Sequence, residues 1–277
     1  MRDASPLRYP GGKWRLANYF EEIIKLNFAR PPVYAEPYAG GASLALSLLF
    51  SNVVSDVYLN DLDAAIHAFW FSVLRHNQDF CRLVDRTPIT PTEWRKQKKI
   101  HTGGLASGRL ALGFATFFLN RTNHSGILNG GMIGGKRQRG EWKLDARFNR
   151  SELVRRIRKI SDFRNRIHLH CQDAADFLRE QRFRKYTFVY LDPPYYQSGR
   201  QLYLNAYKPD DHALVRDCAL SLRCPWVVSY DDVPEIRQLY RSQKSRCVRL
   251  LHTARSARLG REVMFFSGTL RIPSKIQ

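Results

Sequence analysis

Short apolar runs alternate with helical patterns over the first 75 residues of the chain. Val33–Glu36 predicts a strand, a glycine-rich turn follows it, and Ser43–Phe50 predicts a helix. Residues 53–59 predict a second strand and residues 63–75 a second helix. Strands that alternate with helices in this order are typical of a parallel, doubly wound α/β sheet.

The alternation stops near residue 81 and resumes near residue 166. The intervening stretch is basic and rich in glycine, with helical patterns at 91–101, 108–119 and 150–163 around a loop at 122–140. Further strands are predicted at 166–171, 186–191, 225–230, 246–252 and 261–267, the last two as an antiparallel hairpin. We therefore expect one catalytic, cofactor-binding α/β domain from residues 1–80 and 166–277, interrupted by a mostly helical module at residues 81–165.

The chain is strongly basic. Its 277 residues include 45 Lys and Arg against 25 Asp and Glu, a net charge of +20. Residues 121–166 contain 13 basic and 4 acidic side chains, and residues 235–277 contain 10 and 2. An excess of this size favours a polyanionic partner such as nucleic acid, so we expect both segments to contact phosphates.

The five cysteines and eight histidines form no metal or disulfide pattern. The cysteines lack a CxxC pair, the histidines are scattered, and no carboxylate cage appears, so no metal is expected. No apolar run approaches the roughly 18 residues that a membrane span needs, and the first residues lack a signal-peptide core. These features predict a cytoplasmic protein without a membrane partner.

A compact motif follows the apolar run at 186–191. Its residues are Asp192, Pro193, Pro194, Tyr195 and Tyr196. The prolines fix the backbone and lack N–H donors, so the motif predicts a rigid acceptor site beside an aromatic ring. Asp192 and the Pro193 carbonyl can accept both hydrogens of a planar exocyclic amine, while Tyr195 or Tyr196 stacks on its ring. Fixed acceptors stabilise the positive charge that develops when such an amine attacks an electrophile. A non-catalytic Pro-Pro turn is the alternative.

A glycine-rich turn joins the first predicted strand to its helix. Its residues include Glu36, Tyr38, Gly40 and Gly41. Open α/β sheets bind nucleotide-like ligands at such a turn, but neither a GxGxxG fingerprint nor a P-loop is present. Asp61 ends the second predicted strand, where a carboxylate can accept hydrogen bonds from both ribose hydroxyls. The combination fits a nucleoside without a pyrophosphate, and S-adenosylmethionine is such a molecule. A tight turn and a helix cap are the alternatives.

Taken together, these motifs resemble the D12 class of N6-adenine DNA methyltransferases, which includes the Dam methylases. The resemblance covers nearly the whole chain, and its motifs lie at 7–13, 36–41, 60–61, 117–126, 192–195 and 229–231. It implies a Rossmann-like sheet that binds S-adenosylmethionine, with an inserted target-recognition module. The implied activity is site-specific methyl transfer to N6 of an adenine in double-stranded DNA.

The resemblance also implies roles for individual residues. The cofactor contacts would be Tyr9, Gly12, Lys13, Glu36, Tyr38, Gly40, Asp61, Asp173 and Asp192. Tyr9 and Lys13 would bind the methionyl part and Asp61 the ribose. Asp173 would accept a hydrogen bond from the cofactor adenine, with a helix-cap role as the alternative. The catalytic residues would be Asp192, Pro193, Pro194 and Tyr195.

In this family the segment corresponding to residues 121–129 enters the duplex, and the target base leaves the stack because N6 is otherwise out of reach. The expected DNA contacts are Arg121, His124, Ser125, Asn129, Lys136, Arg137 and Arg139, with a second basic run at 155–159. His124 and Ser125 replace the Tyr-Asn of the Dam methylases, and Asn129 replaces an Arg. Because Arg reads guanine and Asn can read adenine, this difference argues against GATC as the recognition sequence.

Two alternatives use the same residues differently. One keeps the chemistry but changes the substrate to an RNA adenine or a protein glutamine, and the other is a catalytically inactive DNA-binding protein. The net charge of +20 disfavours a protein substrate, and the intact motif at 192–195 disfavours the inactive protein. We expect a bacterial or phage-encoded monomer, and whether it works beside a restriction endonuclease stays open.

Overall fold

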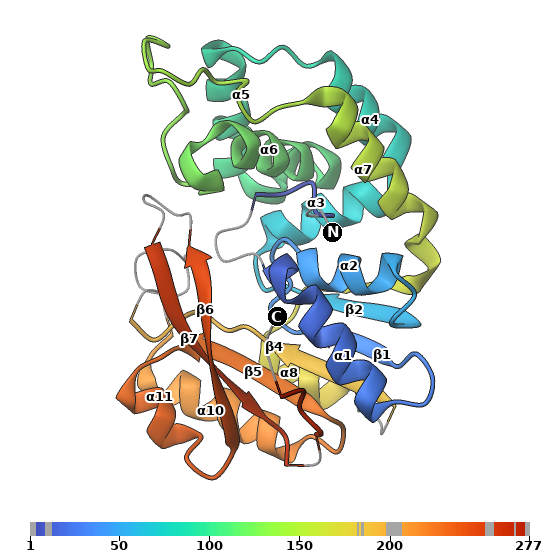
Figure 1. Ribbon diagram of the computed structural model, residues 1–277. Coiled ribbons are helices and arrows are strands. Elements are labelled where there is room, and N and C mark those ends of the chain that lie inside the picture. Colours follow the sequence, from blue (N-terminus) through green and yellow to red (C-terminus); the bar gives the residue numbers. More distant parts are fainter. Residues whose placement is uncertain are drawn as a thin grey trace.

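Seven strands form one mixed sheet between two layers of helices in the computed structural model (Figure 1). The structure describes residues 4–8, 13–181, 183, 186–197, 207–252, 258–268 and 270–274, without the side chains of 249–252 and 258–259. Tyr9 and Gly12 of the predicted cofactor set lie outside the described residues.

The strands are β1 (Val33–Glu36), β2 (Asp56–Asn60), β3 (Ile167–His170), β4 (Thr187–Leu191), β5 (Trp226–Asp231), β6 (Lys244–His252) and β7 (Arg258–Phe266). Their order in the sheet is β3-β2-β1-β4-β5-β7-β6, with the first five parallel and β7 antiparallel to both β5 and β6. The predicted α/β class and the predicted C-terminal hairpin are confirmed. Because the chain order reverses between β1 and β4, the edge where these strands end is where open α/β sheets bind ligands.

The second strand starts later than predicted, at Asp56 rather than at residue 53. Val53 and Val54 are buried although they precede β2, with exposed fractions of 8% and 0%. Their apolar side chains belong to the core next to α2 (Ser43–Phe50). Hydrophobicity alone therefore did not show where the strand begins.

Alternating side chains of the strands face two different helical layers. Phe188 and Tyr190 of β4 pack in the cluster that contains α1 (Ala17–Asn27), α2 and α3 (Ala64–Arg75). Val189 and Leu191 pack in the opposite cluster, with α8 (Ala174–Glu180), α10 (Pro209–Ser221) and α11 (Pro234–Leu239). A strand buried on both faces reads as a continuous apolar run, as 187–191 does. A short 3-10 helix, η1 (Lys13–Leu16), precedes α1.

The inserted module is mostly helical and lies above the sheet in Figure 1. Its elements are α4 (Asn77–Arg86), α5 (Pro91–Thr102), η2 (Gly104–Ser107), α6 (Arg109–Thr122), η3 (His124–Gly126), α7 (Arg150–Asp162) and η4 (Arg164–Arg166). The α4 helix begins before the predicted start of the module at residue 81, and Asn77 bonds the Ile157 carbonyl of α7 at 3.0 Å. One hydrophobic cluster continues from α1 to α7, so the module shares its core with the sheet.

Within the described residues, no helix is both long enough and apolar enough to cross a membrane.

Candidate active site

Carboxylates gather at one edge of the sheet because the strands that precede them are parallel. Glu36 ends β1, Asp61 follows β2, Asp192 follows β4 and Asp231 ends β5. Parallel strands place their carboxyl ends on the same side, so side chains that are far apart in the sequence meet there.

Asp192 is anchored through both carboxylate oxygens. The Ser229 hydroxyl of β5 donates to Oδ1 at 2.7 Å, and the Lys13 ammonium lies 2.9 Å from Oδ2. Ser229 is in turn within 2.8 Å of the Tyr190 hydroxyl. The sequence analysis named Ser229 only as part of a motif, whereas the structure shows that it orients the carboxylate.

Lys13 is a buried lysine that joins three side chains from distant parts of the chain. Its ammonium donates to the Tyr195 hydroxyl at 2.8 Å and lies 3.4 Å from Oε1 of Glu262 on β7. The Tyr195 hydroxyl also donates to Oε1 of Glu262. Burial raises the pKa of Tyr195 well above its usual value, and the negative charges of Asp192 and Glu262 add to the shift. Tyr195 therefore stays a hydrogen-bond donor.

Glu262 is a site residue that the sequence analysis missed. Its side chain is fully buried, and it directly precedes the apolar residues Val263–Phe266 of β7. A buried glutamate normally needs a partner, so an acidic residue inside the run at 261–267 was the available signal.

Asp231 fixes the chain just after the motif at 192–195. Its two carboxylate oxygens accept hydrogen bonds from the backbone N–H groups of Tyr196 and Gln197, both at 2.9 Å. The ring of Tyr196 lies 5.1 Å from that of His212 on α10. Tyr195 and Tyr196 thus have different surroundings, one polar and one aromatic.

The turn after β1 is held by Asp61. Oδ2 of Asp61 accepts from the Gly40 N–H at 2.8 Å, and Oδ1 accepts from the Asp63 N–H at 2.9 Å. The indole N–H of Trp70 donates to the Gly40 carbonyl at 2.9 Å, and Gly40 adopts a φ of 45°. Surrounding protein disfavours the charged form of Asp61 and raises its pKa to about 6.

Glu36 lies beneath the same turn. Its Oε1 accepts from the Tyr34 hydroxyl at 2.9 Å and from the Ala45 N–H at 3.2 Å. Burial raises its pKa to about 8. The carboxyl group thereby connects β1 to the first turn of α2.

Tyr38 lies in the turn after β1, and Asp173 lies at the start of α8. The Tyr38 hydroxyl lies 3.1 Å from that of Tyr207, a residue that the sequence analysis did not name. Burial raises the pKa of Tyr207, and the negative charges of Asp173 and Asp61 raise it further. Asp173 caps α8 by accepting from the Ala175 N–H at 2.8 Å, so the cap interpretation is confirmed. Its contact with a cofactor stays a prediction.

A comparison with known protein families identifies the family of this chain. The family model of the D12 class N6 adenine-specific DNA methyltransferases matches residues 9–101 and 113–253. The chain belongs to this class. The match includes every acidic residue of the sheet edge described above, and it ends before Glu262.

Solved structures are similar to this D12-class chain only at low sequence identity. The rRNA methyltransferase aviRa from Streptomyces viridochromogenes is 13% identical, with a TM-score of 0.41 and coverage of 93% of this chain and 85% of that one. A SAM-dependent methyltransferase from Agrobacterium tumefaciens is 10% identical, with a TM-score of 0.42 and coverage of 91% and 61%. No curated protein matches the chain.

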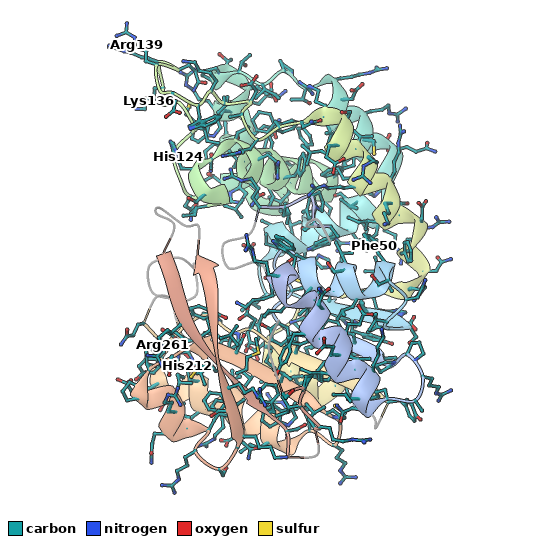
Figure 2. The ribbon with its side chains drawn as sticks, viewed as in Figure 1. Phe50, His124, Lys136, Arg139, His212 and Arg261 are labelled. Carbon is teal, nitrogen blue, oxygen red and sulfur yellow. The ribbon has the colours of Figure 1, made fainter. Side chains whose placement is uncertain are left out.

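The predicted DNA contacts of the D12-class chain fall into two groups. Arg121 and Asn129 contact other parts of the module, through Arg121 Nε to the Arg147 carbonyl at 2.7 Å and Lys98 Nζ to Asn129 Oδ1 at 3.2 Å. The second group is less constrained. Figure 2 shows Lys136 and Arg139 at the outer end of the loop after α6, with exposed side chains, and His124 nearer its base. Arg137 is also exposed, and Ser125 is in η3 with a φ of 57°.

The basic run at 155–159 is used within the protein. Both Arg155 and Arg156 bond Glu152, and Arg156 also donates to the Ser5 carbonyl at 2.8 Å. The Lys159 ammonium lies 4.5 Å from the centre of the Phe50 ring. In Figure 2, Phe50 is at the right of the molecule and His124 at the left. Contact of this run with phosphates stays a prediction, because Arg155, Arg158 and Lys159 are exposed.

Among the described residues, no group of three His, Cys, Asp or Glu side chains is arranged to bind a metal ion.

Proposed function

We propose that this D12-class enzyme transfers the methyl group of S-adenosylmethionine to N6 of an adenine that has left the stack of duplex DNA. The anchoring of Asp192 by Ser229 and Lys13 is the observation that supports the proposal most directly. It holds a carboxylate in one orientation beside Tyr195, at the sheet edge that also contains Asp61.

The residues around the turn after β1 fit the proposed methyl donor. Each carboxylate oxygen of Asp61 accepts one hydrogen bond from the backbone and can accept a second one. These remaining acceptor positions suit ribose hydroxyls. Gly40 presents backbone rather than a side chain to the ligand. Asp173, Tyr38 and Tyr207 lie close to one another and would contact the adenine ring, and Glu36 would support the turn through its bond to Ala45. Bound S-adenosylmethionine supplies an electrophilic methyl carbon on a sulfonium sulfur.

The catalytic motif would prepare the target amine for attack. Ser229 and Lys13 each occupy one acceptor position on Asp192, which leaves each oxygen able to accept another hydrogen bond. Asp192 and the Pro193 carbonyl would accept the two N6 hydrogens and stabilise the positive charge that develops on nitrogen. Pro194 keeps the backbone rigid, and Tyr195 or Tyr196 would stack on the base. The methyl group would pass from the sulfonium sulfur to N6 and leave a neutral thioether, and the proton that N6 then loses would pass to solvent.

The helical module at 81–165 would bind the DNA. Residues 121–166 have a net charge of +9, and the exposed Lys136, Arg137 and Arg139 lie at the outer end of its loop. Extrusion of the base is required because N6 is not accessible in a stacked, paired adenine. An RNA adenine is the second candidate substrate, on the same chemistry.

The direct test incubates purified protein with radiolabelled S-adenosylmethionine and unmethylated duplex DNA or RNA, followed by identification of the modified base. We expect label only in N6-methyladenine of DNA. Asp192→Ala should abolish transfer and leave DNA binding within about twofold, while Asp217→Ala, which removes an exposed carboxylate of α10, should retain activity. Label only in RNA, or no label despite tight DNA binding, would contradict the proposal.

Sequencing of the methylated positions in a whole genome would then identify the recognition sequence. The same data would show whether a restriction endonuclease that cleaves this sequence accompanies the enzyme.

A further inference from the structure

A pocket of about 460 Å³ lies in the helical module, away from the sheet edge. Its walls include Arg8, His124, Ser125, Glu141, Trp142 and Arg147. His124 and Ser125 were expected to contact DNA. Arg8 belongs to the motif at 7–13 but was given no role, and no motif pointed to Glu141, Trp142 or Arg147. The pocket therefore combines the first motif with the loop after α6.

Arg8 is fixed in the pocket wall by its backbone. Its N–H donates to Asn120 Oδ1 at 2.7 Å, and Asn120 Nδ2 donates back to the Arg8 carbonyl at 2.8 Å. The guanidinium group also donates to the Asn123 carbonyl at 3.2 Å. A Cβ at Gly126 would come within 2.3 Å of the Arg8 carbonyl oxygen, so only glycine allows this approach. Arg8 is thus positioned before any ligand binds.

Arg147 brings a second positive charge to the same pocket. Its guanidinium lies 5.4 Å from the ring of Trp142, which is 57% exposed. Burial lowers the pKa of Arg8, and the charge of Arg147 lowers it further. Neither arginine forms an ion pair with a carboxylate among the described residues, so the two like charges face one cavity without an internal counter-ion.

We propose that this pocket binds one phosphate of the DNA backbone between Arg8 and Arg147, with the adjoining sugar against Trp142. The proposal rests on DNA being the substrate. The planar fork of a guanidinium matches two phosphate oxygens, and the exposed indole offers an apolar surface that a free anion would not need. Glu141, the acidic residue of the wall, can accept a hydrogen bond from a base amino group. The volume suits a nucleotide unit rather than a single ion.

The two arginines of the pocket differ from the basic side chains at the outer end of the loop because contacts within the protein hold them before DNA binds. Lys136, Arg137 and Arg139 would attract DNA over a distance, but a freely rotating side chain loses entropy when it contacts a phosphate. Arg147 is also exposed, but its guanidinium is partly immobilised against the Trp142 ring. We therefore expect its removal to weaken binding more than the removal of Lys136.

The experiment measures binding of a mixed-sequence duplex DNA of about 30 base pairs by fluorescence anisotropy, at several salt concentrations. Arg147→Ala keeps the backbone carbonyl that accepts from Arg121, so it removes the charge without removing that hydrogen bond. It should weaken binding about tenfold and make the slope of log K against log salt less negative by about 0.9. Trp142→Ala should weaken binding without changing that slope, and Trp142→Phe should restore most of it.

Arg179→Ala is the matched control, because Arg179 is an exposed arginine of α8 that is paired with Asp176. Its affinity and salt slope should equal those of the wild type. Thermal melting of all variants shows whether each one folds. Equal affinity and salt slope for Arg147→Ala and Arg179→Ala would refute phosphate binding in the pocket. This result would leave the proposed methyl transfer by the wild type unaffected. If the wild type did not methylate DNA but Arg147→Ala weakened DNA binding as expected, only the proposed activity would be refuted. A wild type that does not bind duplex DNA would refute both the activity and the phosphate-binding pocket.

Discussion

The ammonium nitrogen of Lys13 lies 2.9 Å from Oδ2 of Asp192 and 3.4 Å from Oε1 of Glu262. One buried cation is thus shared between the carboxylate after β4, for which we propose a catalytic role, and a carboxylate of the C-terminal hairpin. Removing a single member of a buried ion pair typically costs about 3–5 kcal/mol, because the remaining charge stays without compensation. The three residues therefore connect the first motif, the catalytic motif and the end of the sheet.

Glu262→Gln should lower kcat with little change in the KM for DNA. The amide keeps an acceptor for the Tyr195 hydroxyl but removes the charge that draws Lys13 away from Asp192. Lys13 would then bind Asp192 more tightly and compete with the target amine, which we expect to slow transfer about tenfold. Steady-state kinetics and a thermal melt of the same preparation measure this. A kcat equal to that of the wild type in a folded variant would show that Glu262 does not influence Asp192.

Ser229→Ala should slow methyl transfer and leave DNA affinity unchanged. The hydroxyl is the donor that fixes Oδ1 of Asp192, so its loss allows the carboxylate to rotate away from the amine. We expect a loss of about tenfold in kcat and about 1–2 kcal/mol of stability, since the Tyr190 hydroxyl also loses a partner. Ser221→Ala is the control, because Ser221 bonds only the Cys218 carbonyl at the end of α10. Similar kinetics for the two variants would refute the orienting role.

Affinity for S-adenosylhomocysteine, the product of methyl donation, should fall as the pH drops through about 6. The pKa of Asp61 is raised to about 6, so the group is a carboxylate above this pH and a neutral acid below it. Ribose hydroxyls donate best to the charged form, which predicts weaker binding at pH 5 than at pH 7. Isothermal titration calorimetry across this range tests the effect. Asp61→Asn should bind weakly at both values, and an unchanged pH dependence in this variant would assign the titration to another group.

Gly113→Ala should destabilise the packing of α6 against α3. A Cβ at this position would lie 2.4 Å from the Ala68 carbonyl oxygen and 2.7 Å from Ser72 Oγ, so the helices would have to separate. Overpacking of this kind costs about 1–3 kcal/mol, which the higher helix propensity of alanine offsets by about 1.

Gly131→Ala is the matched control for that change, because nothing lies within 4 Å of its added Cβ. Its free energy of unfolding in urea should stay within about 0.5 kcal/mol of the wild type. A Gly113→Ala variant as stable as Gly131→Ala would mean that α3 and α6 adjust without cost.

Much of the sheet could be predicted from the sequence, because the strand propensity of these segments agrees with their burial. The run at 186–191 is β-rich and became β4, which is buried on both faces. Residues 53–55 were misassigned because burial in a turn and burial in a strand select the same side chains. The helix α1 was not predicted, although Phe20, Ile23 and Ile24 are buried at helical spacing.

The sequence pointed to candidate site residues that follow strand ends and did not point to candidates inside strands. Asp61 and Asp192 follow β2 and β4, a position with a known geometric meaning in parallel sheets. Glu262 lies within β7, and its partner Lys13 is near the other end of the chain, so no local pattern connects them. The pairing of Arg8 with Arg147 across one pocket was hidden for the same reason.

Short segments of the sequence indicate the chemistry that we propose: an Asp-Pro-Pro-Tyr motif, a glycine-rich turn with a carboxylate after the next strand, and a basic segment between two parts of the sheet. The residue types of these segments limit what they can bind. Only the folded chain shows which side chains orient Asp192 and which basic side chains have partners within the protein. The run at 155–159 and the residues Arg8 and Arg147 are all basic, yet the former contacts Glu152 and the protein backbone while the latter two face a pocket. Charge is a property of the residue, but its availability depends on the partners that folding places within reach.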